Sequence, residues 1–125
     1  MMNPWTRLLA IAGITTLALA SPADAHSWYT KKKDPVTNLG CCGGTDCNTL
    51  LIEPGVLSAE VNGYRVRLTL EQAQRINPAR RDGVDILIPW ERVQPSEDGN
   101  WHLCLPRWND VTVGDFYCFF APPNG

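Results

Sequence analysis

The residues of this 125-residue chain best suited to chemistry are its five cysteines. Three fall within the stretch Cys41-Cys42-Gly43-Gly44-Thr45-Asp46-Cys47, and the other two, Cys104 and Cys118, lie in apolar runs near the C-terminus. Clustered thiols can bind a metal, exchange disulfides or form structural bridges. The gap between Cys42 and Cys47 is loose for zinc, and Cys104 and Cys118 are too far apart to form a paired zinc knuckle. We therefore expect structural disulfides rather than a metal–thiolate site.

The N-terminus has the three parts of a secretory signal peptide. Met1 to Arg7 carries one positive charge, Leu8 to Ala20 is apolar, and Ala23-Asp24-Ala25 supplies the small residues before a cleavage site. The apolar run is too short for a membrane-spanning helix, which needs about 20 residues. We predict cleavage after Ala25, a periplasmic or secreted location, and one domain formed by residues 26–125, with no membrane association after cleavage.

Export places the thiols in an oxidising compartment, where neighbouring thiols form disulfides. Because five is odd, at most two bridges form, and a bridge between adjacent Cys41 and Cys42 would strain the peptide that joins them. We predict that two of Cys41, Cys42 and Cys47 bond to Cys104 and Cys118, with one of the adjacent pair left free. The glycine-rich loop has little else to hold it. A direct Cys104–Cys118 bridge across neighbouring strands is the alternative.

Two histidines, His26 and His102, remain after the predicted cleavage. Cleavage after Ala25 would make His26 the first residue, so that its α-amine and a ring nitrogen could chelate one ion. His102 could then complete a T-shaped copper site. The plainer interpretation is that residue one is arbitrary and that His102 is a strand residue with its ring on the surface.

Charge and motifs argue against several function classes. The formal net charge of −2 gives no electrostatic reason to expect nucleic acid as a partner. The sequence contains no Gly-x-Ser-x-Gly, His-Glu-x-x-His or phosphate-loop motif. Asp46 and Asp98 lie in glycine-containing turns, where Asp side chains bond to the backbone, so neither is assigned a catalytic role. A reactive thiolate needs a positive neighbour, whereas the charge nearest to Cys41 and Cys42 is Asp46.

Residues 56–68 predict a β-hairpin. Asn62-Gly63 is the preferred two-residue hairpin turn, which would pair Val61 with Tyr64. The same register would pair Ala59 with Val66 and Leu57 with Leu68, and would place all these apolar residues on one face.

The remaining elements are short. Thr69 and Gln72 form a capping-box pattern, which predicts a helix over residues 70–76. Residues 79–83 form a polar loop in which Arg80 and Arg81 could bind a ligand but are expected to be solvated. Residues 26–40 form an irregular arm, with Trp28 and Tyr29 as its anchors on the core. Strands are predicted over residues 84–90, 101–105, 111–113 and 116–121.

Several motifs together resemble a family of small exported bacterial proteins with no assigned activity. They are His26-x-Trp28-Tyr29, Cys41-Cys42-x-x-x-Asp46-Cys47, Ile88-Pro89-Trp90, Pro95-Ser96-x-Asp98-Gly99 with His102-x-Cys104, and Cys118-Phe119-Phe120-Ala121-Pro122-Pro123. In this chain the segment Thr30 to Gly40 separates the first motif from the second. The resemblance implies export and a five-cysteine module, and it implies no mechanism.

The sequence thus predicts a β-rich α+β domain. We expect one small twisted antiparallel sheet, curled into a half-barrel, with one short helix and disulfide staples. The leading functional hypothesis is a monomeric, non-enzymatic binding or structural module, without a cofactor and with an unidentified protein or small-molecule partner. A copper-binding protein that uses His26 and His102 is the second hypothesis, and a thiol redox protein is the third.

Overall fold

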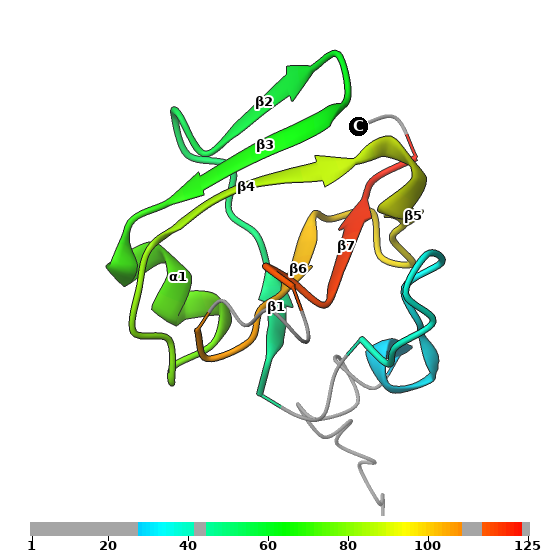
Figure 1. The fold of residues 1–125 in the computed structure, drawn as a ribbon, viewed down its shortest axis with the longest axis horizontal. Coiled ribbons are helices and arrows are strands. Elements are labelled where there is room, and N and C mark those ends of the chain that lie inside the picture. Colours follow the sequence, from blue (N-terminus) through cyan, green and yellow to red (C-terminus); the bar gives the residue numbers. More distant parts are fainter. Residues whose placement is uncertain (1–27, 42–44, 109–113, 124–125) are drawn as a thin grey trace, which may run out of the picture.

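The computed structural model describes residues 28–41, 45–108 and 114–123. In this part of the chain short strands form two sheets, accompanied by one α-helix (Figure 1). The elements in order are β1 (Cys47–Thr49), β2 (Leu57–Glu60), β3 (Gly63–Leu68), α1 (Leu70–Ile76), β4 (Val84–Pro89), the 3₁₀ turn η2 (Trp90–Arg92), β5 (Val93–Pro95), β6 (His102–Cys104) and β7 (Cys118–Ala121). This confirms the predicted class, a small β-rich α+β fold with disulfides.

The first sheet contains three antiparallel strands in the order β2-β3-β4. The β2–β3 hairpin is present, but its predicted register is wrong by two residues, because Glu60 pairs with Gly63 and Leu57 with Val66. The turn therefore consists of Val61 and Asn62, and Val61 is 92% exposed instead of facing inward. Because side chains in a strand alternate between the two faces, a shift of two residues leaves the remaining side chains of β2 and β3 on their predicted faces.

The register of the β2–β3 hairpin follows from the position of Gly63 beside β4. This residue lies opposite Pro89 on β4, where a Cβ atom would overlap the carbonyl oxygen of Ile88. The glycine therefore serves the close approach of β3 to β4 rather than the turn.

Helix α1 begins and ends where its sequence signals predict. The Thr69 hydroxyl accepts from the backbone N–H of Gln72, and the Gln72 side chain accepts from the backbone N–H of Thr69. Both bonds of the capping box are thus present. Ala73 and Ile76 face the core, and Asn77 ends the helix before Pro78.

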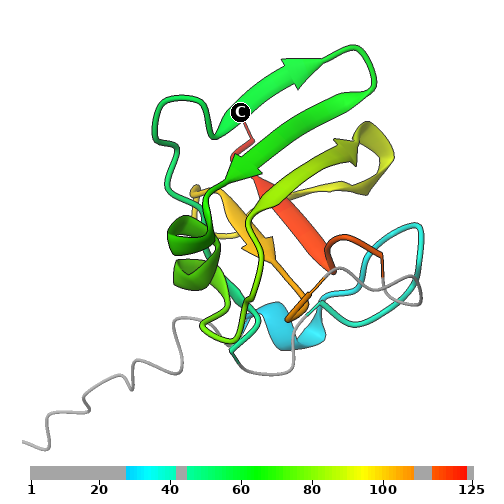
Figure 2. The same cartoon turned by 60° about the vertical axis from the view of Figure 1, so that its left-hand side comes forward.

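The second sheet has four strands in the order β1-β6-β7-β5. The single antiparallel sheet expected from the sequence is thus divided in two, and β5 runs parallel to β7. The 3₁₀ turn η2 carries the chain from β4 in the first sheet to β5 in the second (Figure 2). Strand β5 was not predicted, and β6 and β7 are each shorter than their predicted strands.

Two clusters of buried side chains form the core. The larger lies between the sheets and α1, and includes Val66, Ile86, Leu103 and Phe119. The smaller contains the four bridged cysteines together with Tyr29 and Phe120. The expectation that Arg80 is solvated is wrong, because this side chain is buried and donates to the carbonyl oxygens of Asp82, Gly83 and Pro106. Burial lowers its pKa from the ordinary value.

Several predictions fall outside the described residues. These are the signal peptide over residues 1–25, the strand over residues 111–113, His26 and Cys42. Among the helices that are described, none has the length and apolar character needed to span a membrane.

Candidate functional site at the junction of arm and sheet

The arm, defined here as residues 28–41, packs against the four-stranded sheet. It starts with a 3₁₀ turn over residues 28–31 and folds back on itself through a β-bridge between Lys33 and Gly40. Tyr29 is buried in the smaller core cluster and Trp28 packs against that cluster. The arm is therefore anchored by the two aromatic residues that the sequence predicted.

His102 lies at the centre of this junction and is only 2% exposed. Its Nε2 atom lies 2.6 Å from Asp98 Oδ1, and its Nδ1 atom is hydrogen-bonded to the hydroxyl of Tyr29. A carboxylate can only accept, so in the neutral ring Nε2 carries the proton and Nδ1 accepts from the tyrosine O–H. A continuous chain of hydrogen bonds thus runs from Asp98 at the surface to Tyr29 in the interior.

Asp98 is the solvent-facing end of this chain, with 40% of its side chain exposed. Partial burial raises the pKa of Asp98, but the hydrogen bond from His102 and the backbone N–H of Asn100 outweigh this effect. The net result is a pKa below the ordinary value of a carboxyl group. Asp98 therefore remains ionised at neutral pH and fixes both the tautomer and the orientation of the imidazole.

Trp28 packs against the His102 ring. Its ring meets the His102 ring edge-on, with centroids 5.0 Å apart, and meets Phe120 in the same manner at 4.9 Å. The indole N–H of Trp28 is buried and has no hydrogen-bond partner among the described residues. The contact of Trp28 with His102 and Phe120 is therefore one of ring packing.

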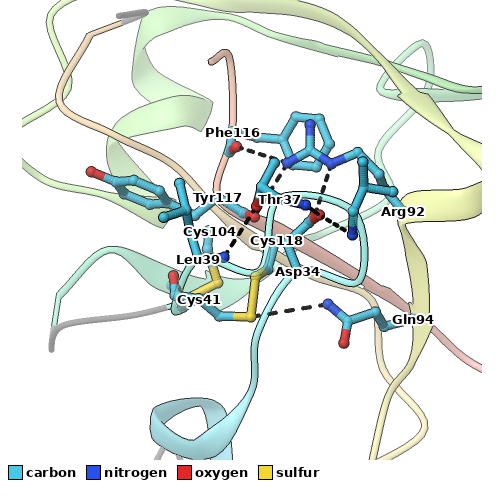
Figure 3. The surroundings of a disulfide bond; sticks show 12 residues. Asp34, Thr37, Leu39, Cys41, Arg92, Gln94, Cys104, Phe116, Tyr117 and Cys118 are labelled. Carbon is cyan, nitrogen blue, oxygen red and sulfur yellow. Dashed lines mark hydrogen bonds and ion pairs between the residues drawn. A yellow bond between two sulfur atoms is a disulfide. The ribbon is translucent and has the colours of Figure 1, made fainter. Parts of the chain in front are cut away.

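An ion pair between Asp34 of the arm and Arg92 of η2 forms the second connection of the junction (Figure 3). Arg92 Nε lies 2.7 Å from Asp34 Oδ2, and the Asp34 side chain is fully buried. The other carboxylate oxygen accepts the backbone N–H groups of Val36 and Thr37, both at 2.8 Å. Burial raises the pKa of Asp34, but these hydrogen bonds and the guanidinium together lower the pKa by more than burial raises it. The pKa of Asp34 therefore lies below the ordinary value of a carboxyl group.

Arg92 is held in place from the opposite direction. Its guanidinium carbon lies 3.8 Å from the centroid of the Phe116 ring, and its Nη2 is within 3.5 Å of the carbonyl oxygens of Phe116 and Tyr117. The cation thus contacts a carboxylate, a ring face and two carbonyl groups at once. Such a pair is fully compensated although it is largely removed from water.

The two disulfides complete the junction. Cys41 at the end of the arm is bonded to Cys118 on β7 (Figure 3). Cys47 on β1 is bonded to Cys104 on β6. Both bridges join the cysteine cluster to the C-terminal strands, as predicted from the sequence. The alternative Cys104–Cys118 bridge is wrong, since each of these residues has a different partner.

The predicted site residues therefore lie in different situations. The structure places four of the five cysteines and His102 within one junction, while Cys42 and His26 are outside the described residues. Sequence reasoning missed Asp98 and Tyr29 as partners of His102, and it missed the Asp34–Arg92 pair. Within the described ranges, no three His, Cys, Asp or Glu side chains are grouped so that they could hold a metal ion.

The residues of this junction serve to hold the arm on the sheet. The His102 ring has a partner at each nitrogen, and the bridged cysteines are almost completely buried.

Comparison with known proteins does not identify a relative, since no protein-family model, no curated protein and no solved structure matches the chain.

Proposed function

We propose that this protein is an exported, non-enzymatic binding module that acts in the periplasm or outside the cell. The observation that carries the proposal is that the side chains capable of acid–base or redox chemistry are engaged in structural contacts. Contacts that hold the arm or the sheet together are made by His102, Asp98, the Asp34–Arg92 pair and both disulfides. Two bridges in a small domain suit an oxidising compartment, where they compensate for a modest core.

Burial of the bridges favours this role over thiol redox chemistry. Catalytic disulfides require a sulfur that an incoming thiolate can reach. Cys41, Cys104 and Cys118 are at most 1% exposed, and Cys47 is 6% exposed. We therefore expect the purified protein not to accelerate reduction of insulin by dithiothreitol, with thioredoxin as the positive control. Turnover that persists after replacement of Cys42 by Ser would show that the buried bridges react, and would refute the proposal.

A copper-binding role is the second candidate, and one observation favours it. The Trp28 ring contacts the His102 ring edge-on, so the arm reaches the histidine on the sheet. His26 precedes Trp28 by two residues, a covalent reach of at most about 7 Å. The engagement of both His102 nitrogens opposes this role, because a copper ion would have to replace either Tyr29 or Asp98.

Copper titration of the correctly processed protein separates the two candidates. The variants are His26→Ala, His102→Gln and a form with one additional residue before His26. For a binding module we expect His102→Gln to lower the temperature of thermal unfolding without changing copper uptake. One-to-one copper binding that is lost in all three variants would instead establish the copper site.

A further inference from the structure

A hollow of about 330 Å³ lies where the chain passes from the first sheet to the second. We call it the Trp90 hollow. In Figure 1 this region is the turn between β4 and β5, beside the end of β7. Its lining consists of Tyr64, Trp90, Val93, Gln94, Pro95, Ala121, Pro122 and Pro123. The volume is at the lower end of the range for small-molecule sites, about 300 to 1,000 Å³.

The exposed aromatic surface of the hollow is fixed before any ligand arrives. Trp90 is 44% exposed, yet its indole N–H donates to the carbonyl oxygen of Val61 at 2.8 Å. Its backbone N–H donates to the carbonyl oxygen of Asn62 at 3.2 Å. The ring also meets Tyr64 edge-on, with centroids 4.8 Å apart. Trp90 therefore presents a rigid ring whose one polar atom is already satisfied, which lowers the entropic cost of binding a ligand.

One polar side chain of the lining has unused hydrogen-bonding capacity. The Tyr64 hydroxyl makes no hydrogen bond to any of the described residues. The Gln94 side chain does not contribute, because its amide group is directed to the disulfide, with Nε2 4.0 Å from the Cys41 sulfur (Figure 3). A hydroxyl group beside an aromatic face suits a ligand that is partly apolar and partly polar.

The absence of charged side chains among the described lining residues indicates an uncharged ligand. None of the described residues that line the hollow is Asp, Glu, Lys or Arg. A charged ligand would lose hydration there without gaining an opposite charge. The lining therefore suits a neutral molecule that has an apolar face to lie on Trp90 and a hydroxyl group to bond with Tyr64.

We propose that the Trp90 hollow binds a neutral oligosaccharide. A pyranose ring has an apolar C–H face and a rim of hydroxyl groups, which matches a fixed indole ring beside the free Tyr64 hydroxyl. The inference rests on the proposed function as a binding module and supplies the chemical class of its ligand. A proline-rich peptide fits less well, because the indole N–H of Trp90, which could donate to a peptide carbonyl group, is already occupied by the carbonyl oxygen of Val61.

The test is titration of the ¹⁵N-labelled mature protein, observed through its tryptophan indole N–H signals. The probes are cellotetraose, chitotetraose and maltotetraose, with tetragalacturonate as a matched charged probe and decaproline as the peptide probe. We expect at least one neutral tetrasaccharide to shift the Trp90 signal in a saturable manner. The signal of Trp108, which is 43% exposed on another part of the surface, should not move. Tetragalacturonate should bind at least about tenfold more weakly.

Three variants locate the binding. Trp90→Ala should abolish it, and Tyr64→Phe, which keeps the ring and removes only the hydroxyl, should weaken it about 2- to 10-fold. Trp108→Ala is the matched control and should bind as the unaltered protein does. Thermal unfolding of each variant identifies any loss of fold, and Tyr64→Phe tests the site even if Trp90→Ala destabilises the hairpin turn.

Several outcomes would overturn the inference. Binding that is unchanged in Tyr64→Phe and Trp90→Ala would place the sugar elsewhere. A Trp90 shift with decaproline alone would assign the hollow to a peptide, and no shift with any probe would show that the hollow is not a ligand site. None of these results bears on insulin reduction or copper uptake, so failure of the sugar site is distinguishable from failure of the proposed function.

Discussion

Each disulfide should stabilise the protein by less than it would alone, because one bridge is nested inside the other. Cys41–Cys118 closes a loop with a sequence separation of 77, and Cys47–Cys104 lies within it with a separation of 57. In the chain-entropy description, a bridge stabilises a protein by restricting the unfolded chain, and the effect grows with the logarithm of loop length. The presence of one bridge therefore changes the loop that the other closes.

The size of the coupling follows from the two separations. Acting alone, the inner bridge would contribute about 4.2 kcal/mol and the outer bridge about 4.5 kcal/mol. Once Cys47–Cys104 is closed, the shortest covalent path between Cys41 and Cys118 falls to about 20 residues, which reduces the outer contribution to about 3.3 kcal/mol. Because both orders of closing the bridges must give the same total, the inner bridge contributes about 3.0 kcal/mol while the outer bridge is intact.

The assay is urea unfolding of two double variants, Cys41→Ala with Cys118→Ala, and Cys47→Ala with Cys104→Ala. Both are made in a background with Cys42→Ser, which prevents exchange with the remaining bridge. Each should lose about 3 kcal/mol of unfolding free energy, as a lower bound, since loss of buried sulfur contacts adds to the entropic cost. A loss below about 1 kcal/mol for either pair would refute the reasoning, because the corresponding bridge would then not restrict the unfolded chain.

Three further predictions concern single contacts. Asp34→Asn should lower the free energy of unfolding by about 3 kcal/mol, because it leaves the buried partner cation without a counter-charge; an unchanged urea midpoint would contradict this. The pKa values of Asp34 and Asp98 are lowered on folding, so their stabilisation is present above the unfolded-state value of about 3.9 and is lost as the pH falls through the folded-state values. Thermal unfolding should accordingly move to lower temperature below about pH 4, and less steeply in Asp34→Asn. Gly63→Ala should destabilise the sheet by about 1 to 3 kcal/mol, whereas Gly40→Ala, where a Cβ meets no neighbour, should unfold almost as the unaltered protein does.

The parts of the fold that could be predicted are those encoded by adjacent residues. The capping box of Thr69 and Gln72 fixes the start of α1 without help from the rest of the chain. Alternating apolar residues similarly determine which faces of β2 and β3 point inward. The register of that hairpin depends on a distant residue, Ile88, whose carbonyl group leaves room only for a glycine at position 63. A local turn preference had no means of detecting that contact.

Strand β5 illustrates the second limit. It has three residues and ends in Pro95, a composition that resembles a turn rather than a strand. Its hydrogen bonds are to β7, with Val93 opposite Phe119, and they form only because η2 carries the chain from one sheet to the other. The Asp34–Arg92 pair was missed for the same reason, since the two residues are 58 positions apart and neither carries a local signal of burial.

At the candidate site, a metal ion would have to compete with Tyr29 or Asp98 for a nitrogen of His102, and the sequence did not predict these two partners. From the sequence alone, His102 was either a copper ligand or a surface strand residue. The structure provides it instead with one partner from the arm, 73 residues away, and one from the preceding turn, four residues away. The two partners are not equally replaceable. Exchange of Tyr29 would break a hydrogen bond between two buried side chains, whereas Asp98 is 40% exposed and would be solvated by water once released. Any metal that binds His102 should therefore approach Nε2 from the Asp98 side and leave the tyrosine that anchors the arm in place.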